Sequence, residues 1–98
     1  MKKKTVCVIG LGYIGLPTAA LLANKGYHVA GVDVNQEIVS TINKGKIHIV
    51  EADLDASVKS AISSGQLKAF NKIQPSDVYI ICVPTPFHKN NKIPEPNI

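Results

Sequence analysis

Three glycines and one aspartate carry the clearest chemical signal in this sequence. Gly10, Gly12 and Gly15 form a G-x-G-x-x-G motif, and Asp33 follows about 20 positions further on. Between a buried strand and a helix, such a motif can hold the pyrophosphate of a dinucleotide, and the acidic residue can accept hydrogen bonds from the adenosine ribose. An apolar run over 6–9 precedes the motif and an apolar periodic segment follows it. The spacing therefore predicts a dinucleotide-binding site.

Each position of the motif has a separate physical task. Gly10 allows a tight turn, Gly12 lets the pyrophosphate approach the backbone, and Gly15 lets the helix lie close to the first strand. Tyr13 and Ile14 present backbone N–H groups at the helix N-terminus, where the helix dipole favours an anion. A side-chain cation is therefore not needed to hold the phosphates.

Asp33 also distinguishes between the two common dinucleotides. It closes a second apolar run over 29–32, so its carboxylate is expected at the end of the second strand. A 2′-phosphate at that point would be repelled and would need a nearby arginine, and the chain contains no arginine. The sequence therefore predicts NAD, rather than NADP, as the cofactor.

Two other interpretations of the same residues remain open. Lysines at positions 2–4 followed by an apolar run are similar to the start of a secretory signal, although the glycines and Pro17 interrupt that run. The glycines could also serve only to pack a helix on a strand in a Rossmann-like domain that binds no nucleotide. The position of Asp33 favours the dinucleotide site over both.

The elements that would position this site alternate regularly along the chain. Strands are predicted over 5–9, 28–32, 67–70 and 78–83, helices over 13–25, from the N-cap Asn35 to 44 and from the N-cap Asp53 to Gly65, and an ordered loop over 47–52. This pattern predicts an α/β fold, a Rossmann-like parallel sheet with helices on both faces. Residues 1–98 would form the N-terminal part of one NAD-binding domain, incomplete because the full dinucleotide fold has six strands.

The strand order 3-2-1-4 of this fold constrains the link between the last two strands. Residues 71–77 must cross two strands, a distance of roughly 15 Å at about 4.8 Å per strand. They can do so only when largely extended, at about 3.3 Å per residue, and Pro75 suits an extended chain. A full crossover helix is therefore not expected there.

Composition argues against several other functions. The chain has 98 residues, 45% of them hydrophobic, and a net charge of +4 that comes from lysine. No segment joins basic residues to stacking aromatics, so nucleic acid is not an expected partner. No apolar segment reaches the roughly 20 residues that span a bilayer, so no membrane contact is expected either.

The cysteines and histidines give no sign of chemistry. Cys7 and Cys82 lie in apolar runs, which predicts buried, unreactive thiols and a cytoplasmic protein. His28, His48 and His88 lack the spacing of metal ligands, so no metal site is expected.

Four stretches of the sequence carry a family resemblance: residues 8–17, Asp33, residues 47–51 and residues 83–86. Together they resemble the N-terminus of the UDP-glucose/GDP-mannose dehydrogenase family, over essentially the whole chain. Segment 47–55 is most similar to the members that oxidise UDP-N-acetyl-D-mannosamine. The glycine motif is generic, whereas its continuation to Pro17 and the Pro-Thr-Pro sequence at 84–86 are more specific.

The resemblance implies a nucleotide-sugar 6-dehydrogenase that oxidises UDP-N-acetyl-D-mannosamine to its uronate in two NAD-dependent steps. It assigns the pyrophosphate to Gly10, Gly12, Tyr13, Ile14 and Gly15, the adenosine ribose to Asp33, and the nicotinamide side to Pro84 and Thr85. Ile38 stands where many members carry a lysine or arginine against the ribose. The family's catalytic cysteine lies far downstream, so no catalytic residue is expected here, and the chain alone should be inactive.

Other functions remain open from the residues alone. An NAD-sensing regulatory module of potassium transport uses the same arrangement without chemistry, although the Pro-Thr-Pro corner argues against it. A small hydroxyacid dehydrogenase shares the fingerprint and differs downstream. Within the resembling family, UDP-glucose and UDP-N-acetylglucosamine are alternative UDP-sugar substrates of the full-length protein. A homo-oligomer is also expected, because a fourth strand without a further neighbour exposes an apolar edge.

Overall fold

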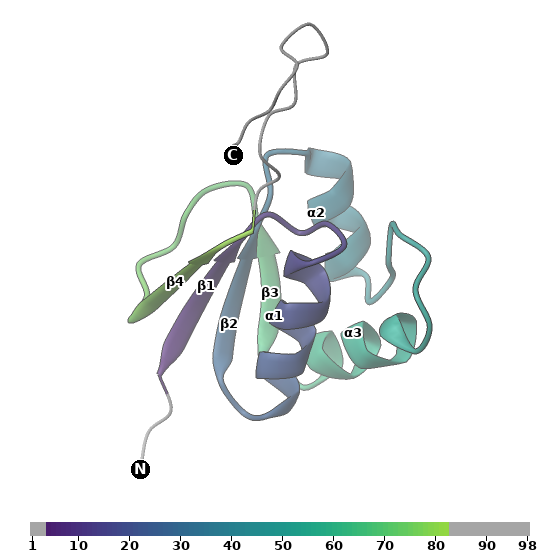
Figure 1. Ribbon diagram of the computed structural model, residues 1–98, viewed down its shortest axis with the longest axis horizontal. Coiled ribbons are helices and arrows are strands. Elements are labelled where there is room, and N and C mark those ends of the chain that lie inside the picture. The colour runs from purple at the N-terminus through teal and green to yellow at the C-terminus, as the bar shows by residue number, and fades with distance from the viewer. Residues whose placement is uncertain (1–3, 83–98) are drawn as a thin grey trace, which may run out of the picture.

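The computed structural model describes residues 4–82 and shows one parallel sheet with helices packed against it (Figure 1). The strands are β1 (Thr5–Ile9), β2 (His28–Val32), β3 (Leu67–Phe70) and β4 (Val78–Ile81), and the helices are α1 (Gly15–Asn24), α2 (Gln36–Asn43) and α3 (Leu54–Ser63). The strand order is β3-β2-β1-β4. The predicted Rossmann-like α/β fold and its strand order are confirmed.

The strands begin and end almost where the sequence predicts. The predicted bounds of β1, β2 and β3 are confirmed, whereas β4 ends at Ile81 and Val83 lies outside the described residues. The amide of Cys82 still donates to the carbonyl of Ile9 at 2.7 Å, so one more ladder bond follows β4. Linker 71–77 contains no helix, which confirms the extended crossover.

A reciprocal set of hydrogen bonds fixes the start of β4 beside the start of β1. The Asp77 carboxylate accepts from the amide and the hydroxyl of Thr5, at 2.9 and 3.1 Å. The Asp77 amide in turn donates to the carbonyl and the hydroxyl oxygen of Thr5, each at 3.0 Å. These bonds set the register in which Val6 pairs with Val78.

The helices differ more from the predictions than the strands do. Helix α1 begins at Gly15 rather than at Tyr13. Asn35 caps α2 as predicted, since its side-chain oxygen accepts from the amides of the residues at 37 and 38. Asp53 precedes α3, but its carboxylate makes no capping bond, so the predicted capping is wrong. Its left-handed backbone, with φ of 64°, replaces the extended conformation from which an N-cap side chain reaches the helix.

One hydrophobic core joins the described helices to a single face of the sheet. Along the strands, Val6, Val8, Val29, Leu67 and Ala69 belong to this core with residues of all three helices. Side chains alternate between the faces of a strand, so Cys7 and Val32 point to the opposite face, which linker 71–77 crosses. Within residues 4–82 the helices therefore cover one face, and the predicted helices of the second face are not among the described residues.

The findings on cysteines, membrane-spanning helices and metal clusters concern the described residues. Cys7 is fully buried in β1 as predicted, whereas Cys82 follows the end of β4 and is only half-buried, so the prediction of a buried thiol is wrong there. Between residues 4 and 82, no helix has the length and apolar character needed to cross a membrane. The same part of the chain contains no cluster of three acidic, histidine or cysteine residues able to hold a metal ion.

Candidate cofactor-binding site

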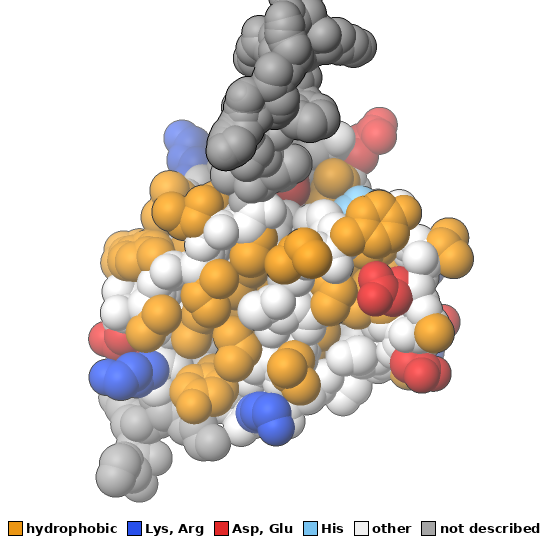
Figure 2. Space-filling view, viewed as in Figure 1, with side chains coloured by type: hydrophobic (Ala, Val, Ile, Leu, Met, Phe, Trp, Pro, Cys, Tyr) orange, Lys and Arg blue, Asp and Glu red, His pale blue; other side chains and the backbone are white. Residues whose placement is uncertain are grey.

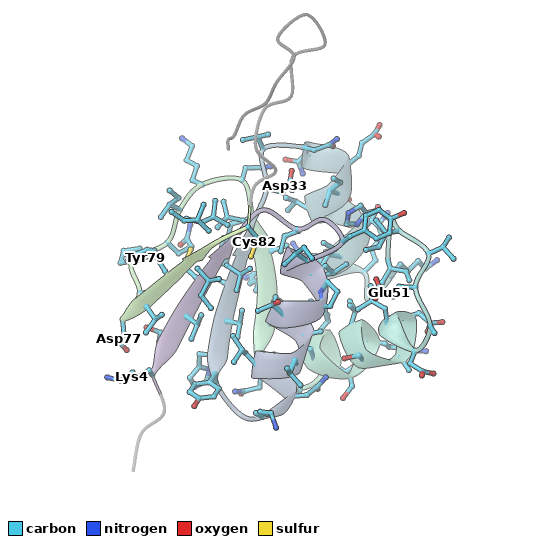
Figure 3. All side chains as sticks on the ribbon, in the orientation of Figure 1. Lys4, Asp33, Glu51, Asp77, Tyr79 and Cys82 are labelled. Carbon is cyan, nitrogen blue, oxygen red and sulfur yellow. The ribbon has the colours of Figure 1, made fainter. Side chains whose placement is uncertain are left out.

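The carboxyl ends of three neighbouring strands meet at one edge of the sheet. Ile9, the last residue of β1, pairs with Val32 at the end of β2 and with Ile81 at the end of β4. The next residues along the chain include Asp33 and Cys82, which lie at the same end of the sheet (Figure 3). In open α/β sheets, ligands bind beyond the carboxyl ends of the strands, at the point where the strand order reverses. In this sheet that point lies at β1, which has β2 on one side and β4 on the other.

The turn that leaves β1 is built around Gly10. Its φ is 99°, a conformation that side chains with a Cβ rarely adopt. Its amide donates to the carbonyl of Val32 at 2.7 Å, and the carbonyl of Gly12 accepts from the amide of Leu16 at 3.1 Å. The turn therefore leads the chain from the sheet directly into α1.

Gly12 and Gly15 are glycines for different reasons. A Cβ added to Gly15 would lie 1.6 Å from the carbonyl oxygen of Gly10 and 3.2 Å from the Cβ of Cys82. Apart from its two chain neighbours, a Cβ added to Gly12 would meet no atom of the described residues within 4 Å. Gly15 thus allows α1 to approach the ends of β1 and β4, whereas Gly12 leaves space that the described residues do not use.

The N-terminus of α1 presents uncommitted backbone donors. No side chain caps the helix, and its first turn contains no acidic residue. Among residues 4–82, the amides of Gly12, Tyr13 and Ile14 form no hydrogen bond, and the side chains of Tyr13 and Ile14 are 64% and 69% exposed. Free N–H groups at the positive end of a helix dipole form a binding place for an anion such as a phosphate.

Asp33 is held by two backbone amides. Its Oδ2 accepts from the amide of Leu11 at 3.1 Å, and its Oδ1 accepts from the amide of Asn35 at 3.0 Å. A carboxylate has about four acceptor positions, and the bonds within residues 4–82 leave two of them for other donors. The carboxylate thus has a fixed orientation and free acceptor capacity.

A cavity of about 360 Å³ lies between the glycine turn and Asp33. Its lining consists of Ile9, Gly10, Leu11, Gly12, Val32, Asp33, Val34 and Cys82. This volume falls within the range of about 300–1,000 Å³ that ligand pockets occupy. The free amides, the space at Gly12 and the free acceptors of Asp33 match the pyrophosphate and ribose of a dinucleotide, so the residues present fit such a cofactor.

The structure brings most of the predicted site residues together. Gly10, Gly12, Tyr13, Ile14, Gly15 and Asp33 all lie in the turn, at the start of α1 or at the end of β2. Pro84 and Thr85 lie outside the described residues. Ile38, where the resembling family often carries a cation, is half-buried, packs against the core and does not line this cavity.

Sequence reasoning missed five residues that line the cavity. Four of them are sequence neighbours of predicted site residues: Ile9, Leu11, Val32 and Val34. Cys82 follows from the register of β4 against β1, which places it beside the glycine turn. His48 and Glu51 lie in the loop between α2 and α3, and neither lines this cavity.

A parallel sheet of this order, with a glycine turn and an acidic residue at the ends of β1 and β2, defines a Rossmann-type dinucleotide-binding domain. Residues 4–97 match the NAD binding domain of the UDP-glucose/GDP-mannose dehydrogenase family. The chain therefore belongs to that family, and its cofactor is NAD.

Individual relatives agree with this assignment. The chain is 57% identical over 93 residues to a UDP-N-acetyl-D-mannosamine dehydrogenase of Campylobacter jejuni, covering 95% of the chain and 22% of the relative. It is 54% identical over 89 residues to an NDP-N-acetyl-D-galactosaminuronic acid dehydrogenase of Ralstonia nicotianae, covering 91% and 21%.

Solved structures give the same result. The UDP-N-acetyl-mannosamine dehydrogenase of Staphylococcus aureus superposes with a TM-score of 0.83 at 44% identity, covering 87% of this chain and 21% of that one. A ternary complex of the GDP-mannose dehydrogenase of Pseudomonas aeruginosa gives a TM-score of 0.82 at 38% identity, covering 87% and 20%. The chain thus spans about a fifth of the length of the relatives it matches.

Proposed function

We propose that the chain is the NAD-binding part of a nucleotide-sugar 6-dehydrogenase that converts UDP-N-acetyl-D-mannosamine to UDP-N-acetyl-D-mannosaminuronate in two NAD-dependent steps. Residues 1–98 then form the N-terminal part of its Rossmann domain. Relatives at 57% and 58% identity are named for oxidation of this sugar nucleotide, which supports the substrate. The observation that carries the proposal is the uncapped N-terminus of α1 beside the oriented carboxylate of Asp33.

The proposed binding mode assigns one task to each part of the site. The free amides at Gly12, Tyr13 and Ile14 donate to the pyrophosphate, which approaches through the space at Gly12. The two unused acceptor positions of Asp33 equal in number the two hydroxyls of the adenosine ribose. Gly10 and Gly15 shape the turn and the helix start. Pro84 and Thr85 border the nicotinamide, a prediction that rests on the family resemblance.

Bound NAD supplies a hydride acceptor, while this part of the chain binds and orients it. Cys7 is fully buried and cannot trap an aldehyde intermediate, and Cys82 packs against the glycine turn. We therefore expect the 98-residue chain to form no NADH from a UDP-sugar above a no-protein control. Formation of NADH by the purified chain would contradict this assignment.

Calorimetric titration of the 98-residue chain with NAD and NADP tests the cofactor site. NAD should bind better than NADP, because Asp33 would repel a 2′-phosphate. Asp33→Ala should weaken NAD binding by about 1.5–3 kcal/mol, the range for hydrogen bonds to a charged group. Asp55→Ala, which removes an exposed carboxylate from the first turn of α3, is the matched control and should bind NAD like the unmodified chain. Equal affinity for both dinucleotides, or no loss in Asp33→Ala, would remove Asp33 from the site.

A test of the proposed substrate requires the full-length protein. Its rates of NAD reduction with UDP-N-acetyl-D-mannosamine, UDP-N-acetyl-D-glucosamine and UDP-glucose should be highest with the first. A higher kcat/KM for either of the others would reassign the substrate and leave the cofactor site unchanged.

We also propose that the chain self-associates through β4. On the opposite edge of the sheet, the side chain of Asn43 donates to the carbonyl of Ala69 at 3.0 Å and accepts from the amide of Ala69 at 2.8 Å. These two bonds occupy the outer backbone groups of β3 at Ala69. Among the described residues nothing pairs with the outer side of β4, and its side chains on the face without described helices, Tyr79 and Ile81, are 47% and 68% exposed. Figure 2 shows hydrophobic side chains gathered on that side of the molecule. With one edge occupied, two copies can pair β4 with β4 and close a symmetric dimer.

Light scattering of the purified chain tests this association. A dimer is expected for the unmodified chain, and Ile81→Lys should shift it to a monomer, because lysine on an edge strand opposes pairing. Val50→Lys is the control, since Val50 is 92% exposed in a loop away from β4, and it should remain dimeric. A monodisperse monomer at high concentration would contradict self-association through β4.

A further inference from the structure

Leu11, between the first two glycines of the motif, is held by two separate contacts with β2 and its end. Its side chain is 1% exposed and lies directly over Gly31, where an added Cβ would stand 3.0 and 3.2 Å from the two methyl carbons of Leu11. Its amide donates to Asp33 Oδ2 at 3.1 Å. Gly31 therefore receives the Leu11 side chain, and Asp33 orients the Leu11 backbone.

The contacts change abruptly at the next residue along the turn. The amide of Gly10 bonds to the carbonyl of Val32 and the amide of Leu11 bonds to Asp33, so both are committed to the protein. The amide of Gly12 has no partner among residues 4–82, and its Cα faces open space. Residues 10 and 11 thus fix the turn to β2 and its end. The free amides proposed to bind the pyrophosphate follow directly after them along the chain.

We propose that Leu11 and Gly31 are positioning residues for the pyrophosphate of the cofactor. Leu11 seated on Gly31 holds the turn in its binding shape before the cofactor arrives. Through its bond to Leu11, Asp33 couples this seat to the ribose-binding end of the site. The inference rests on the proposed NAD site and extends it to a residue of β2 that does not line the cavity.

The expected cost follows from the space around Leu11. A methyl group at Gly31 requires the Leu11 side chain to move by a few tenths of an ångström, and a fully buried side chain has little room for this. The displacement passes to the backbone at Leu11 and Gly12 and misaligns the amides that meet the pyrophosphate. Small misplacements of binding groups cost far more affinity than their size suggests, because a preorganised site no longer exists before binding.

The central test compares Gly31→Ala with the double variant Gly31→Ala/Leu11→Val. Gly31→Ala should weaken NAD binding about tenfold or more and should alter the chemical shift and hydrogen exchange of the Leu11 amide. It should weaken the binding of adenosine, which lacks the pyrophosphate, by less than it weakens the binding of NAD. Leu11→Val removes volume where the new methyl group adds it, so the double variant should recover most of the NAD affinity.

Val29→Ala is the matched control for loss of stability. Val29 lies on the same strand and face as Gly31 and belongs to the core, but the three atoms nearest to a Cβ added at Gly31 all belong to Leu11. The variant should unfold more easily and still bind NAD like the unmodified chain. A loss of NAD affinity in Val29→Ala equal to that in Gly31→Ala would overturn the positioning role.

Two further outcomes separate this inference from the proposed function. If the unmodified chain binds no NAD, the proposed cofactor site fails. The chemical shift and hydrogen exchange of the Leu11 amide in Gly31→Ala then still test whether Leu11 holds the turn through its contact with Gly31. If the unmodified chain binds NAD and Gly31→Ala binds it equally well, the positioning role fails and the site remains. Should Gly31→Ala not fold, Leu11→Ala replaces it: emptying the seat should speed amide exchange at positions 11 and 12 and weaken NAD binding, and unchanged exchange and affinity would overturn the inference.

Discussion

Helices α1 and α2 both begin where a strand ends at the same edge of the sheet, yet their N-termini are built in opposite ways. Before α2, Asn35 is extended and its side-chain oxygen accepts from two amides of the first turn, which also contains Glu37. Before α1, Ile14 has helical angles, makes no side-chain cap, and no acidic residue follows. Two amides at the start of α2 are capped by a side chain, whereas the amides of Gly12, Tyr13 and Ile14 at the start of α1 have no partner among the described residues.

The difference separates stability from binding. An N-cap side chain contributes about 1 kcal/mol to a helix, and α1 does without this contribution. Its place in the fold depends instead on a buried face that consists of Gly15, Leu16, Ala19, Ala20 and Ala23. The donors left uncapped at α1 are the ones assigned to the pyrophosphate. Because α3 also lacks a capping bond, the absent cap at α1 indicates a binding site only together with the glycine turn and Asp33 beside it.

The largest effect is expected from Gly15→Ala, which attacks the packing that replaces a cap at α1. The new methyl group would overlap the carbonyl oxygen of Gly10, a backbone atom that cannot turn away. The free energy of unfolding should fall by about 3 kcal/mol, at the upper end of overpacking costs. Urea denaturation followed by circular dichroism measures it.

Gly12→Ala is the counterpart at the same turn. Because no atom of the described residues, apart from the two chain neighbours, lies within 4 Å of the added Cβ, stability should stay within about 0.5 kcal/mol, the range of neutral surface substitutions. NAD affinity should nevertheless fall at least about tenfold, since the methyl group fills the space proposed for the pyrophosphate. A stable Gly15→Ala, or a Gly12→Ala that binds NAD normally, would contradict the separate roles of these two glycines.

Ile14→Asp would place a negative charge at the start of α1. Ile14 has helical angles and the third residue of the helix is Pro17, which has no N–H, so the carboxylate gains from the helix dipole and not from a capping bond, and stability should rise by about 0.3–1 kcal/mol. NAD affinity should fall by about 2 kcal/mol, because the carboxylate repels the pyrophosphate. Thermal unfolding and calorimetric titration of the same sample give both quantities.

Ile14→Asn isolates the charge in this experiment. Asparagine has nearly the same shape and no charge, so this variant should show little gain in stability and lose less NAD affinity than Ile14→Asp. Unchanged NAD affinity in both variants would mean that the N-terminus of α1 does not meet the cofactor.

The smallest effect is expected at the closed helix start. Asn35→Ala removes the side-chain acceptor of two α2 amides, so the free energy of unfolding should fall by about 1 kcal/mol. Asn35→Ser, which retains a capping oxygen, should recover most of the loss. NAD affinity should change little in either variant, because the backbone amide that bonds Asp33 is retained. A larger loss of NAD binding than of stability in Asn35→Ala would show that both helix starts serve the cofactor.

Local patterns explain how much of this structure could be predicted from the sequence. The bounds of β2, the cap at Asn35 and the extended linker 71–77 follow from short runs of residues, and all were predicted. Asp53 has a residue type that favours capping, but its φ of 64° is set by the path of the preceding loop, which no local pattern encodes. Capping there could not be decided from sequence alone.

The residues of the site also fall into those that the sequence alone can predict and those that it cannot. The glycine motif and Asp33 are visible because their spacing is fixed by the turn and the strand. The seat of Leu11 on Gly31 and the position of Cys82 depend on the register between β1 and its two neighbours. Register is a property of the assembled sheet, so these residues become visible only in the structure.

The hydrogen bonds between Thr5 and Asp77 imply an order of events during folding. They join residues 72 positions apart, whereas β1, α1 and β2 are consecutive along the chain. Closing a long loop costs more entropy than closing a short one, so we expect β1 and β2 to pair first and β4 to dock last. Until Asp77 has left the ribosome, one side of β1 lacks its neighbour, and the nascent chain exposes there the edge that β4 later covers.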